Sequence, residues 1–216
     1  LPVHVLAWRE GGVFECGVTL KDGELAWAER PADATLMSAA QAPGDYIADY
    51  ELPYLSEVCP AMSHLVSRLA GNLDRGAMLF IDYGFPRAEY YHPQRDHGTL
   101  MCHYRHRAHD DPFFLPGLQD ITAHVDFTAV AEAGVDAGCQ LAGYTTQAQF
   151  LLNCGITGLL ARTPASDVAA YLPLSTAVQK LLSPAEIGEL FKVIALTRGI
   201  DAPLRGFAEG DRSDRL

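Results

Sequence analysis

The sequence lacks the glycine-rich loops with which many enzymes hold nucleotides and nucleotide-like cofactors. Neither GxGxxG nor GxxxxGK[ST] occurs in it, so the backbone cradle that these motifs form between a strand and a helix is missing from these residues. HExxH and CxxC, two common spacings of metal ligands, are missing as well. We therefore expect neither a cofactor-binding loop nor a metal site within this stretch.

Basic residues and long apolar runs are scarce too. The chain has 16 Lys and Arg against 27 Asp and Glu, a formal net charge of −11 and a pI near 5.0. This balance disfavours nucleic acid or an anionic membrane as the partner. No run approaches the roughly 18 apolar residues of a transmembrane helix, and no signal peptide is visible. We expect no membrane insertion.

The cysteines are few and do not suggest a disulfide framework. All five are scattered and their number is odd, which favours reduced thiols in a cytosol-like compartment. A length of 216 residues suits one domain with a substantial core. The chain starts with Leu1-Pro2 directly before a strand-like run, and it has no glycine loop. We expect it to be the later part of something larger.

β-Rich runs dominate the first thirty residues. Glycine-containing turns, Glu10-Gly11-Gly12 and Lys21-Asp22-Gly23, separate the runs 3–8, 13–20 and 24–27. This spacing predicts a three-stranded meander.

The following residues predict a connection and a helix. Residues 30–53 mix Pro, Gly and Asp with little periodicity, as a connection does. Ser56 is then placed to cap a helix with apolar residues at helical spacing that ends near Gly71-Asn72.

The chain is organised around the stretch 80–127. The apolar run 77–81 predicts a buried, parallel strand that breaks at Asp82-Tyr83-Gly84. A carboxylate just past such a strand lies where open α/β sheets bind ligands. The residues after it show little helical periodicity and hold most of the chain's eight histidines. Because this segment is aromatic-rich, we interpret it as an ordered active-site loop.

The rest of the chain alternates helices and strands. Asp126 predicts an N-cap, Thr146 caps a helix that stops at Gly155, and Ser183-Pro184-Ala185-Glu186 predicts another helix start. Further elements are expected at 139–144 (strand), 166–182 (helix broken at Pro173), 191–196 (strand) and from Gly199 onward (a fraying tail). The pattern is α/β, and three core strands alone would leave a hydrophobic edge open.

Several motifs of this chain resemble the MidA-like family of S-adenosylmethionine-dependent methyltransferases. The family includes a mitochondrial complex I assembly factor that methylates an arginine of a complex I subunit. The motifs are Asp82-Tyr83-Gly84, Glu89-Tyr90-Tyr91, Arg95-Asp96-His97-Gly98-Thr99-Leu100, Tyr104-Arg105-His106, the run 116–127 (PGLQDITAHVDF), the run 146–152 (TQAQFLL) and the run 188–199 (GELFKVIALTRG).

The resemblance implies the second half of a Rossmann-like class I methyltransferase sheet. The runs 77–81, 139–144 and 191–196 would be its fifth, sixth and antiparallel seventh strands. Residues 1–216 would be the C-terminal part of a single methyltransferase domain, with a β insertion at 1–30, the sheet, helices and active-site loop at 56–200, and a tail at 201–216. The cofactor loop would lie upstream, so this stretch alone would be inactive.

The resemblance also implies protein-arginine methylation with S-adenosyl-L-methionine as cofactor, in the cytoplasm of a bacterium or the mitochondrial matrix of a eukaryote. A guanidinium substrate is always protonated and needs carboxylates to hold it. The expected catalytic residues are Asp82, Asp120 and His124, the last as proton acceptor. The expected substrate-binding residues are Tyr83, Tyr90, Arg95, Thr99, His106 and Asp126.

Alternatives stay open for these residues and for the whole chain. Asp82 and Asp120 suit turn formation as well as catalysis, Asp126 suits a helix cap, and His124 suits a structural hydrogen bond. The protein could be a non-catalytic assembly factor that uses a methyltransferase fold for recognition. The histidine-rich segment also leaves a metal-dependent hydrolase as a third hypothesis.

Overall fold

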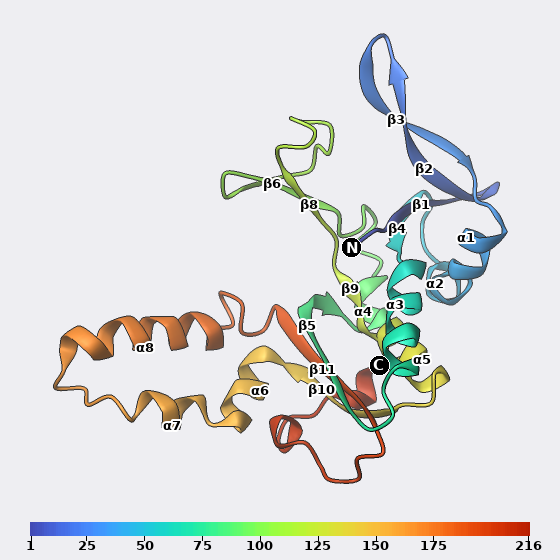
Figure 1. Ribbon diagram of the computed structural model, residues 1–216. Coiled ribbons are helices and arrows are strands. Elements are labelled where there is room, and N and C mark those ends of the chain that lie inside the picture. The colour runs from blue at the N-terminus through green and yellow to red at the C-terminus, as the bar shows by residue number, and fades with distance from the viewer. The chain divides into compact units, whose positions relative to one another are not determined.

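A computed structural model describes all residues, 1–216. The chain forms two compact units. The first comprises Leu1–Leu65 and Arg87–His124, and the second comprises Val66–Pro86 and Val125–Leu216. The fold is mixed α/β with several sheets (Figure 1), and each unit is described by itself.

The first unit is built on a four-stranded antiparallel sheet in the order β3-β2-β1-β4. Its strands are β1 (His4–Arg9), β2 (Gly12–Lys21), β3 (Glu24–Pro31) and β4 (Tyr54–Val58). The predicted meander is confirmed. Asp22 and Gly23 both have positive φ, 54° and 86°, as a two-residue hairpin turn of type I′ requires. The β2–β3 hairpin extends well beyond β1 (Figure 1).

Two predictions for residues 30–60 are wrong. The expected connection contains two short helices, α1 (Ala34–Ala39) and α2 (Gln41–Ile47), and Asp33 caps the first by accepting the Leu36 N–H at 2.9 Å. Ser56 does not cap a helix. It is fully buried inside β4, opposite Leu6 of β1, and helix α3 (Pro60–Gly71) begins instead at a proline, a residue that suits the first helical position.

The stretch 80–127, called the central segment below, is not an irregular loop. It contains α4 (Arg87–Tyr90) and a second small sheet in the order β7-β6-β8, formed by β6 (Met101–Tyr104), β7 (Arg107–His109) and β8 (Asp120–Thr122). These strands are three or four residues long. Such short strands complete too few periods of alternation to be recognised in a sequence.

The second unit contains a four-stranded sheet in the order β10-β11-β5-β9. Its strands are β5 (Gly76–Phe85), β9 (Val125–Asp126), β10 (Gln140–Thr146) and β11 (Phe191–Arg198). β11 runs antiparallel to both of its neighbours. Its residues Val193, Ile194, Ala195 and Leu196 are fully buried. Each large side chain among them contributes about 1.5–3 kcal/mol by leaving water.

β5 differs from the strand that the sequence predicts. It continues through Asp82, Tyr83 and Gly84, because β11 pairs with it as far as Tyr83 and β9 pairs with Gly84 and Phe85. Only the two residues facing β9 are in parallel pairing. The strand is not buried on both faces, since Leu79 and Ile81 are 44% and 49% exposed. The expected break at Asp82 is therefore wrong.

The helices of the second unit follow their caps. Asp126 accepts the Ala129 N–H at 3.1 Å at the start of α5 (Phe127–Asp136), and Thr146 accepts the Gln149 N–H at 3.3 Å at the start of α6 (Gln147–Cys154). Both caps confirm the prediction. The left-handed Gly155 (φ 89°) ends α6 as expected, but a further short helix, α7 (Ile156–Leu160), follows it.

The expected helix at 166–182 is confirmed as α8 (Val168–Leu182), but the break at Pro173 and the helix start at Ser183 are wrong. α8 runs through Pro173 without a break, and it lies alongside α6 and α7 (Figure 1). Just after Pro173, the hydroxyls of Ser175 and Thr176 both donate to the carbonyl of Leu172, the residue before the proline. Residues 183–190 form turns rather than a helix, because the N–H groups of Glu186 and Gly188 both bond the Ser183 carbonyl. None of the helices has the length and hydropathy of a membrane span.

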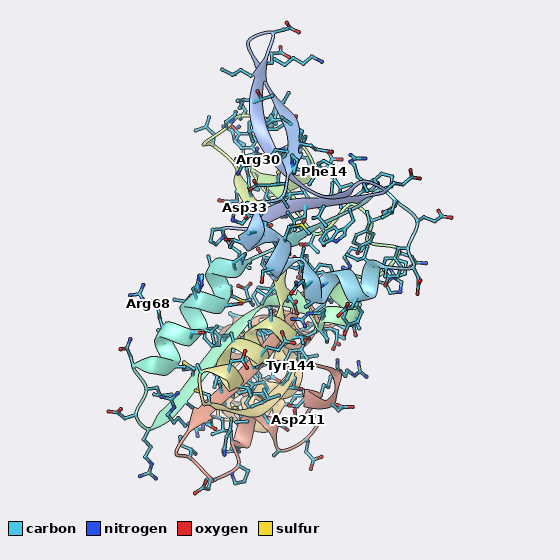
Figure 2. The ribbon with its side chains drawn as sticks, turned by 90° about the vertical axis from the view of Figure 1, so that its right-hand side faces the viewer. Phe14, Arg30, Asp33, Arg68, Tyr144 and Asp211 are labelled. Atoms are coloured by element: carbon cyan, nitrogen blue, oxygen red, sulfur yellow. The ribbon has the colours of Figure 1, made fainter.

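The C-terminal tail does not fray. It forms two 3-10 turns, η1 (Arg205–Phe207) and η2 (Ser213–Arg215), and Phe207 packs in a buried cluster with Val193 and Ala195. Asp211 accepts the Tyr144 N–H at 3.0 Å, and the Thr145 hydroxyl donates to the Gly210 carbonyl at 2.7 Å. Figure 2 shows Tyr144 and Asp211 on adjacent segments. These bonds hold the polar tail against β10.

Candidate functional site

The first unit contains one deeply buried carboxylate, Glu57, near the end of β4. This residue is 1% exposed. Oε1 accepts the N–H groups of Thr99 and Leu100 at 2.9 and 3.0 Å. Oε2 accepts the hydroxyls of Thr99 and Tyr90 at 2.9 and 3.1 Å. Both oxygens are thus satisfied by donors, as a carboxylate in a buried site requires.

The backbone of the segment that faces Glu57 is shaped for this contact. Gly98 has φ +76°, and a β-carbon added to it would lie 2.3 Å from Oε1 of Glu57. Only glycine allows both the left-handed backbone and the close approach. The two N–H groups that follow, those of Thr99 and Leu100, can then point at the same oxygen.

Thr99 links this carboxylate to His124. The Thr99 hydroxyl donates to Glu57 and accepts the His124 backbone N–H at 3.0 Å. Tyr90 also reaches the group, with its hydroxyl 3.3 Å from the Thr99 hydroxyl. Three residues expected in the site, Tyr90, Thr99 and His124, are therefore brought together. Burial and then the nearby Glu57 raise the pKa of Tyr90 well above its usual range, so its hydroxyl remains a donor.

The other expected residues of the first unit lie elsewhere in it. Arg95 is partly buried in a turn, and its backbone N–H donates to the His92 backbone carbonyl. Asp120 is exposed at the start of β8, opposite His103. His106 is exposed at the tip of the β6–β7 hairpin, where Arg105 and His106 have φ of 48° and 63°. Two adjacent non-glycine residues in this conformation are unusual and mark local strain.

Asp82, Tyr83 and Asp126 belong to the second unit. Asp82 lies opposite Lys192 of β11, and its Oδ1 accepts the Tyr83 N–H at 2.8 Å. The Tyr83 ring packs edge-on against Phe191, with ring centroids 5.5 Å apart. Asp126 stands opposite Phe85, three residues after Asp82 on β5. The two aspartates thus lie near the same end of β5, where Asp126 also caps α5.

An apolar hollow in the first unit was not foreseen from the sequence. It has a volume of about 470 Å³ and lies between the meander and the central segment. Trp27 and Phe113 line it with ring centroids 5.2 Å apart, and Leu25 and Ile121 add exposed apolar surface. Glu15, which binds His4 and Arg30, contributes charge. The sequence signal for this hollow was the alternation of Leu25 and Trp27 in the last strand of the meander. Because β3 is an edge strand, nothing in the sheet covers these side chains.

No group of three His, Cys, Asp or Glu side chains is arranged to hold a metal ion. The histidines of the central segment are spread over loops, turns and short strands.

Comparison with known proteins identifies the family. A family profile described as "Putative S-adenosyl-L-methionine-dependent methyltransferase" matches residues 1–145. The chain therefore belongs to this methyltransferase family. This agrees with the resemblance to MidA-like methyltransferases that the motifs indicated.

Two curated relatives are vertebrate arginine methyltransferases. The mitochondrial protein arginine methyltransferase NDUFAF7 of Danio rerio is 31% identical over 143 residues, which cover 65% of this chain and 32% of that protein. NDUFAF7 of Mus musculus is 31% identical over 144 residues, 65% of this chain and 31% of that protein. The chain matches about a third of the length of these relatives.

Two crystal structures from Burkholderia thailandensis are similar over the whole chain. One is a native structure with 55% identity and a TM-score of 0.93, covering 100% of this chain and 57% of that chain. The other, described as a "likely methyl transferase", is bound to S-adenosyl-homocysteine; it has 53% identity and a TM-score of 0.92 and covers 100% of this chain and 55% of that chain. The chain thus spans somewhat more than half of each solved protein.

Proposed function

We propose that this chain is part of an S-adenosyl-L-methionine-dependent methyltransferase that modifies an arginine side chain of a partner protein. The observation that carries the proposal is the similarity, at 53% identity and over the whole chain, to a protein crystallised with S-adenosyl-homocysteine. The arginine acceptor is supported by the names of the vertebrate relatives. Their mitochondrial designation supports a mitochondrial location in eukaryotes. Within that organelle the matrix is proposed, and a cytoplasmic protein is proposed for bacteria.

We assign the strands of the second unit to the later part of a class I methyltransferase sheet. β5, β10 and β11 would be its fifth, sixth and seventh strands. The order β10-β11-β5, with β11 antiparallel to both neighbours, supports this assignment. Within one methyltransferase domain, residues 1–30 would be a β insertion, 56–200 the sheet, helices and central segment, and 201–216 the tail.

No residue of this chain is assigned to the cofactor. The sequence has no glycine-rich strand-to-helix turn of the kind that binds nucleotide-like groups. The contribution proposed for these residues is therefore to the substrate. Methyl transfer requires one nitrogen of the guanidinium to be held and aimed, so alignment and electrostatics are what a protein supplies.

The carboxylates proposed for this task are Asp82 and Asp120. A charged guanidinium forms strong bidentate contacts with carboxylates, which also fix its plane. His124 is proposed to accept the proton that the product loses, because an imidazole titrates near neutral pH. The proposed substrate-binding residues are Tyr83, Tyr90, Arg95, Thr99, His106 and Asp126.

The test uses the full-length protein. Calorimetric titration with S-adenosyl-homocysteine should give one binding site, and incubation with labelled cofactor and candidate partner proteins should yield methylarginine on hydrolysis. Binding without any transfer would favour the non-catalytic assembly factor. Absence of both would overturn the proposal, and stoichiometric zinc in the purified protein would favour a metal-dependent hydrolase instead.

A further inference from the structure

Glu57 is the one acid that the first unit buries with four donors on it. The donors are two consecutive backbone N–H groups and two hydroxyls, all at 2.9–3.1 Å. All of them come from the segment that contains Tyr90, Thr99 and Leu100, which lies 33 to 43 residues further along the chain. The carboxylate thus joins β4 to the middle of the segment that carries most of the proposed substrate residues.

We propose that Glu57 is a positioning residue for substrate: through Tyr90 and Thr99 it holds the segment Gly98–Leu100 and the backbone of His124 in the arrangement that methyl transfer needs. This inference rests on the proposed function. Glu57 itself does not touch the reacting atoms in this scheme. It acts through the Thr99 hydroxyl, which both donates to the carboxylate and accepts the His124 N–H.

A carboxylate at this position can fix the orientation of the facing segment, which an apolar side chain could not do. Replacing a buried charged group by packed apolar side chains is often neutral or stabilising, so stability alone gives little reason for an acid at this position. Hydrogen bonds, unlike apolar contacts, have preferred directions. Oε1 accepts the N–H groups of Thr99 and Leu100, and Oε2 accepts two hydroxyls and shares the Thr99 N–H at 3.0 Å. Together these bonds fix both the position and the rotation of the segment.

The neighbouring residues fit this role. Gly98 has no β-carbon, and one would lie 2.3 Å from Oε1 of Glu57. Tyr91 adds a second link, because its hydroxyl donates to the Glu57 backbone carbonyl at 2.9 Å. Tyr90 and Tyr91 are each 2% exposed and lie with ring centroids 4.8 Å apart. The carboxylate is therefore enclosed, and water cannot easily replace a lost donor.

The decisive variants change Thr99, because its backbone N–H survives substitution. Thr99→Val removes the hydroxyl that bridges Glu57 and His124 but keeps the shape and the N–H bond to Oε1. Thr99→Ser keeps the hydroxyl and is the matched rescue. In the full-length protein we expect Thr99→Val to lower kcat roughly ten- to thirtyfold with little change in cofactor affinity, and Thr99→Ser to stay within about threefold of wild type.

Coupling to Glu57 completes the test. Glu57→Gln keeps the volume but replaces one acceptor by a donor, so kcat should fall by a similar factor. The double variant Glu57→Gln/Thr99→Val should be little worse than either single variant, because both break the same link. Glu29→Gln, which breaks an ion pair with Arg9 on the meander, is the control and should retain wild-type kcat.

The outcomes separate this inference from the proposed function. A folded Thr99→Val protein with wild-type kcat would overturn the positioning role while leaving the methyltransferase intact. Equal losses in Thr99→Val and Thr99→Ser would also overturn it, since the hydroxyl would then be irrelevant. If the wild-type protein binds S-adenosyl-homocysteine but methylates nothing, or binds nothing, the proposed function fails and the inference fails with it.

Discussion

Gly84 lies directly against the backbone of Val125. A β-carbon added to Gly84 would fall 2.1 Å from the Val125 carbonyl oxygen and 2.8 Å from its nitrogen. These two residues are partners in the parallel pairing of β5 with β9. The approach sets the spacing between the end of β5, which carries Asp82, and Asp126 at the start of α5.

Gly84→Ala should therefore be strongly destabilising. The methyl group cannot move away, because the atoms that it meets are backbone atoms. We expect a loss of about 1–3 kcal/mol in the free energy of unfolding, as overpacked buried sites show. Chemical denaturation measures this directly. The matched control is Gly44→Ala in α2, where nothing lies within 4 Å of the added carbon; equal losses in both variants would contradict the close approach.

The thiols should react in an order set by burial. Burial raises the pKa of Cys16, Cys59 and Cys102, and Asp111 and Asp110 add to the rise at Cys102. A raised pKa leaves less thiolate at a given pH, and thiolate is the reactive form. Cys154 is exposed. At a mildly alkaline pH, about 8, near the ordinary thiol pKa, an alkylating reagent should modify Cys154 first and Cys102 only on unfolding, as peptide mass mapping would reveal.

The control for the thiols is Cys154→Ser. This variant should lose the fast phase of modification and keep the slow one. A fast phase that persists at Cys102 would show that this side chain, fully buried here, becomes accessible in the folded protein.

The sequence predicted those elements whose signals are local. The meander follows from two short glycine turns between its strands, and the helix caps Asp126 and Thr146 act on N–H groups three residues away. Such contacts join residues only a few positions apart, so the sequence alone is enough to find them.

The failures depend on distant contacts. Ser56 suits a helix cap by type, but Tyr54–Val58 pairs with His4–Trp8 far earlier in the chain, and this pairing makes it a strand. The tail from Gly199 is polar by composition, yet Asp211 binds the Tyr144 backbone 67 residues away. No local pattern contains either partner.

The candidate site likewise contains residues that the sequence could identify and one that depends on distant contacts. Tyr90, Thr99 and His124 could be chosen from their family motifs, and the fold does bring them together. Glu57 could not be chosen, because its donors lie in another part of the chain and the sequence around it suggested a helix start. The glycine in Gly98-Thr99-Leu100 was the available signal, since a glycine beside buried polar residues often marks a close approach.

His106 can be tested through its strained backbone. It has φ 63° at the second position of the two-residue turn between Tyr104 and Arg107, where glycine is preferred. His106→Gly removes a left-handed penalty of about 1–2 kcal/mol but adds freedom to the unfolded chain worth about 0.5–1 kcal/mol. Tm should therefore stay the same or rise slightly.

If His106 binds substrate, the same variant should show a raised KM at unchanged or higher Tm. Asp22→Asn, at the corresponding kind of turn between β2 and β3, is the control and should leave both values unchanged. A wild-type KM for His106→Gly would remove His106 from the substrate site.

The last prediction concerns the two aspartates proposed to hold the guanidinium. Asp82→Asn and Asp120→Asn keep the shape of the side chain and remove its charge. Because a charge-assisted hydrogen bond contributes about 1.5–3 kcal/mol, each variant of the full-length protein should lose roughly ten- to a hundredfold in kcat/KM. Affinity for S-adenosyl-homocysteine, measured by calorimetry, should barely change.

The melting temperatures of the variants separate a loss of stability from a loss of catalysis at each aspartate. Asp82 accepts the Tyr83 N–H through Oδ1, and an asparagine carbonyl oxygen can still accept this bond; Asp82→Asn should therefore keep its Tm, and Asp82→Ala should lower it. Asp120 is exposed, so neither of its variants should lose stability. Asp45→Asn, at an exposed position of α2, controls for the loss of one surface charge and should keep wild-type kcat/KM. A folded Asp82→Asn or Asp120→Asn protein with wild-type kcat/KM would remove that aspartate from the mechanism.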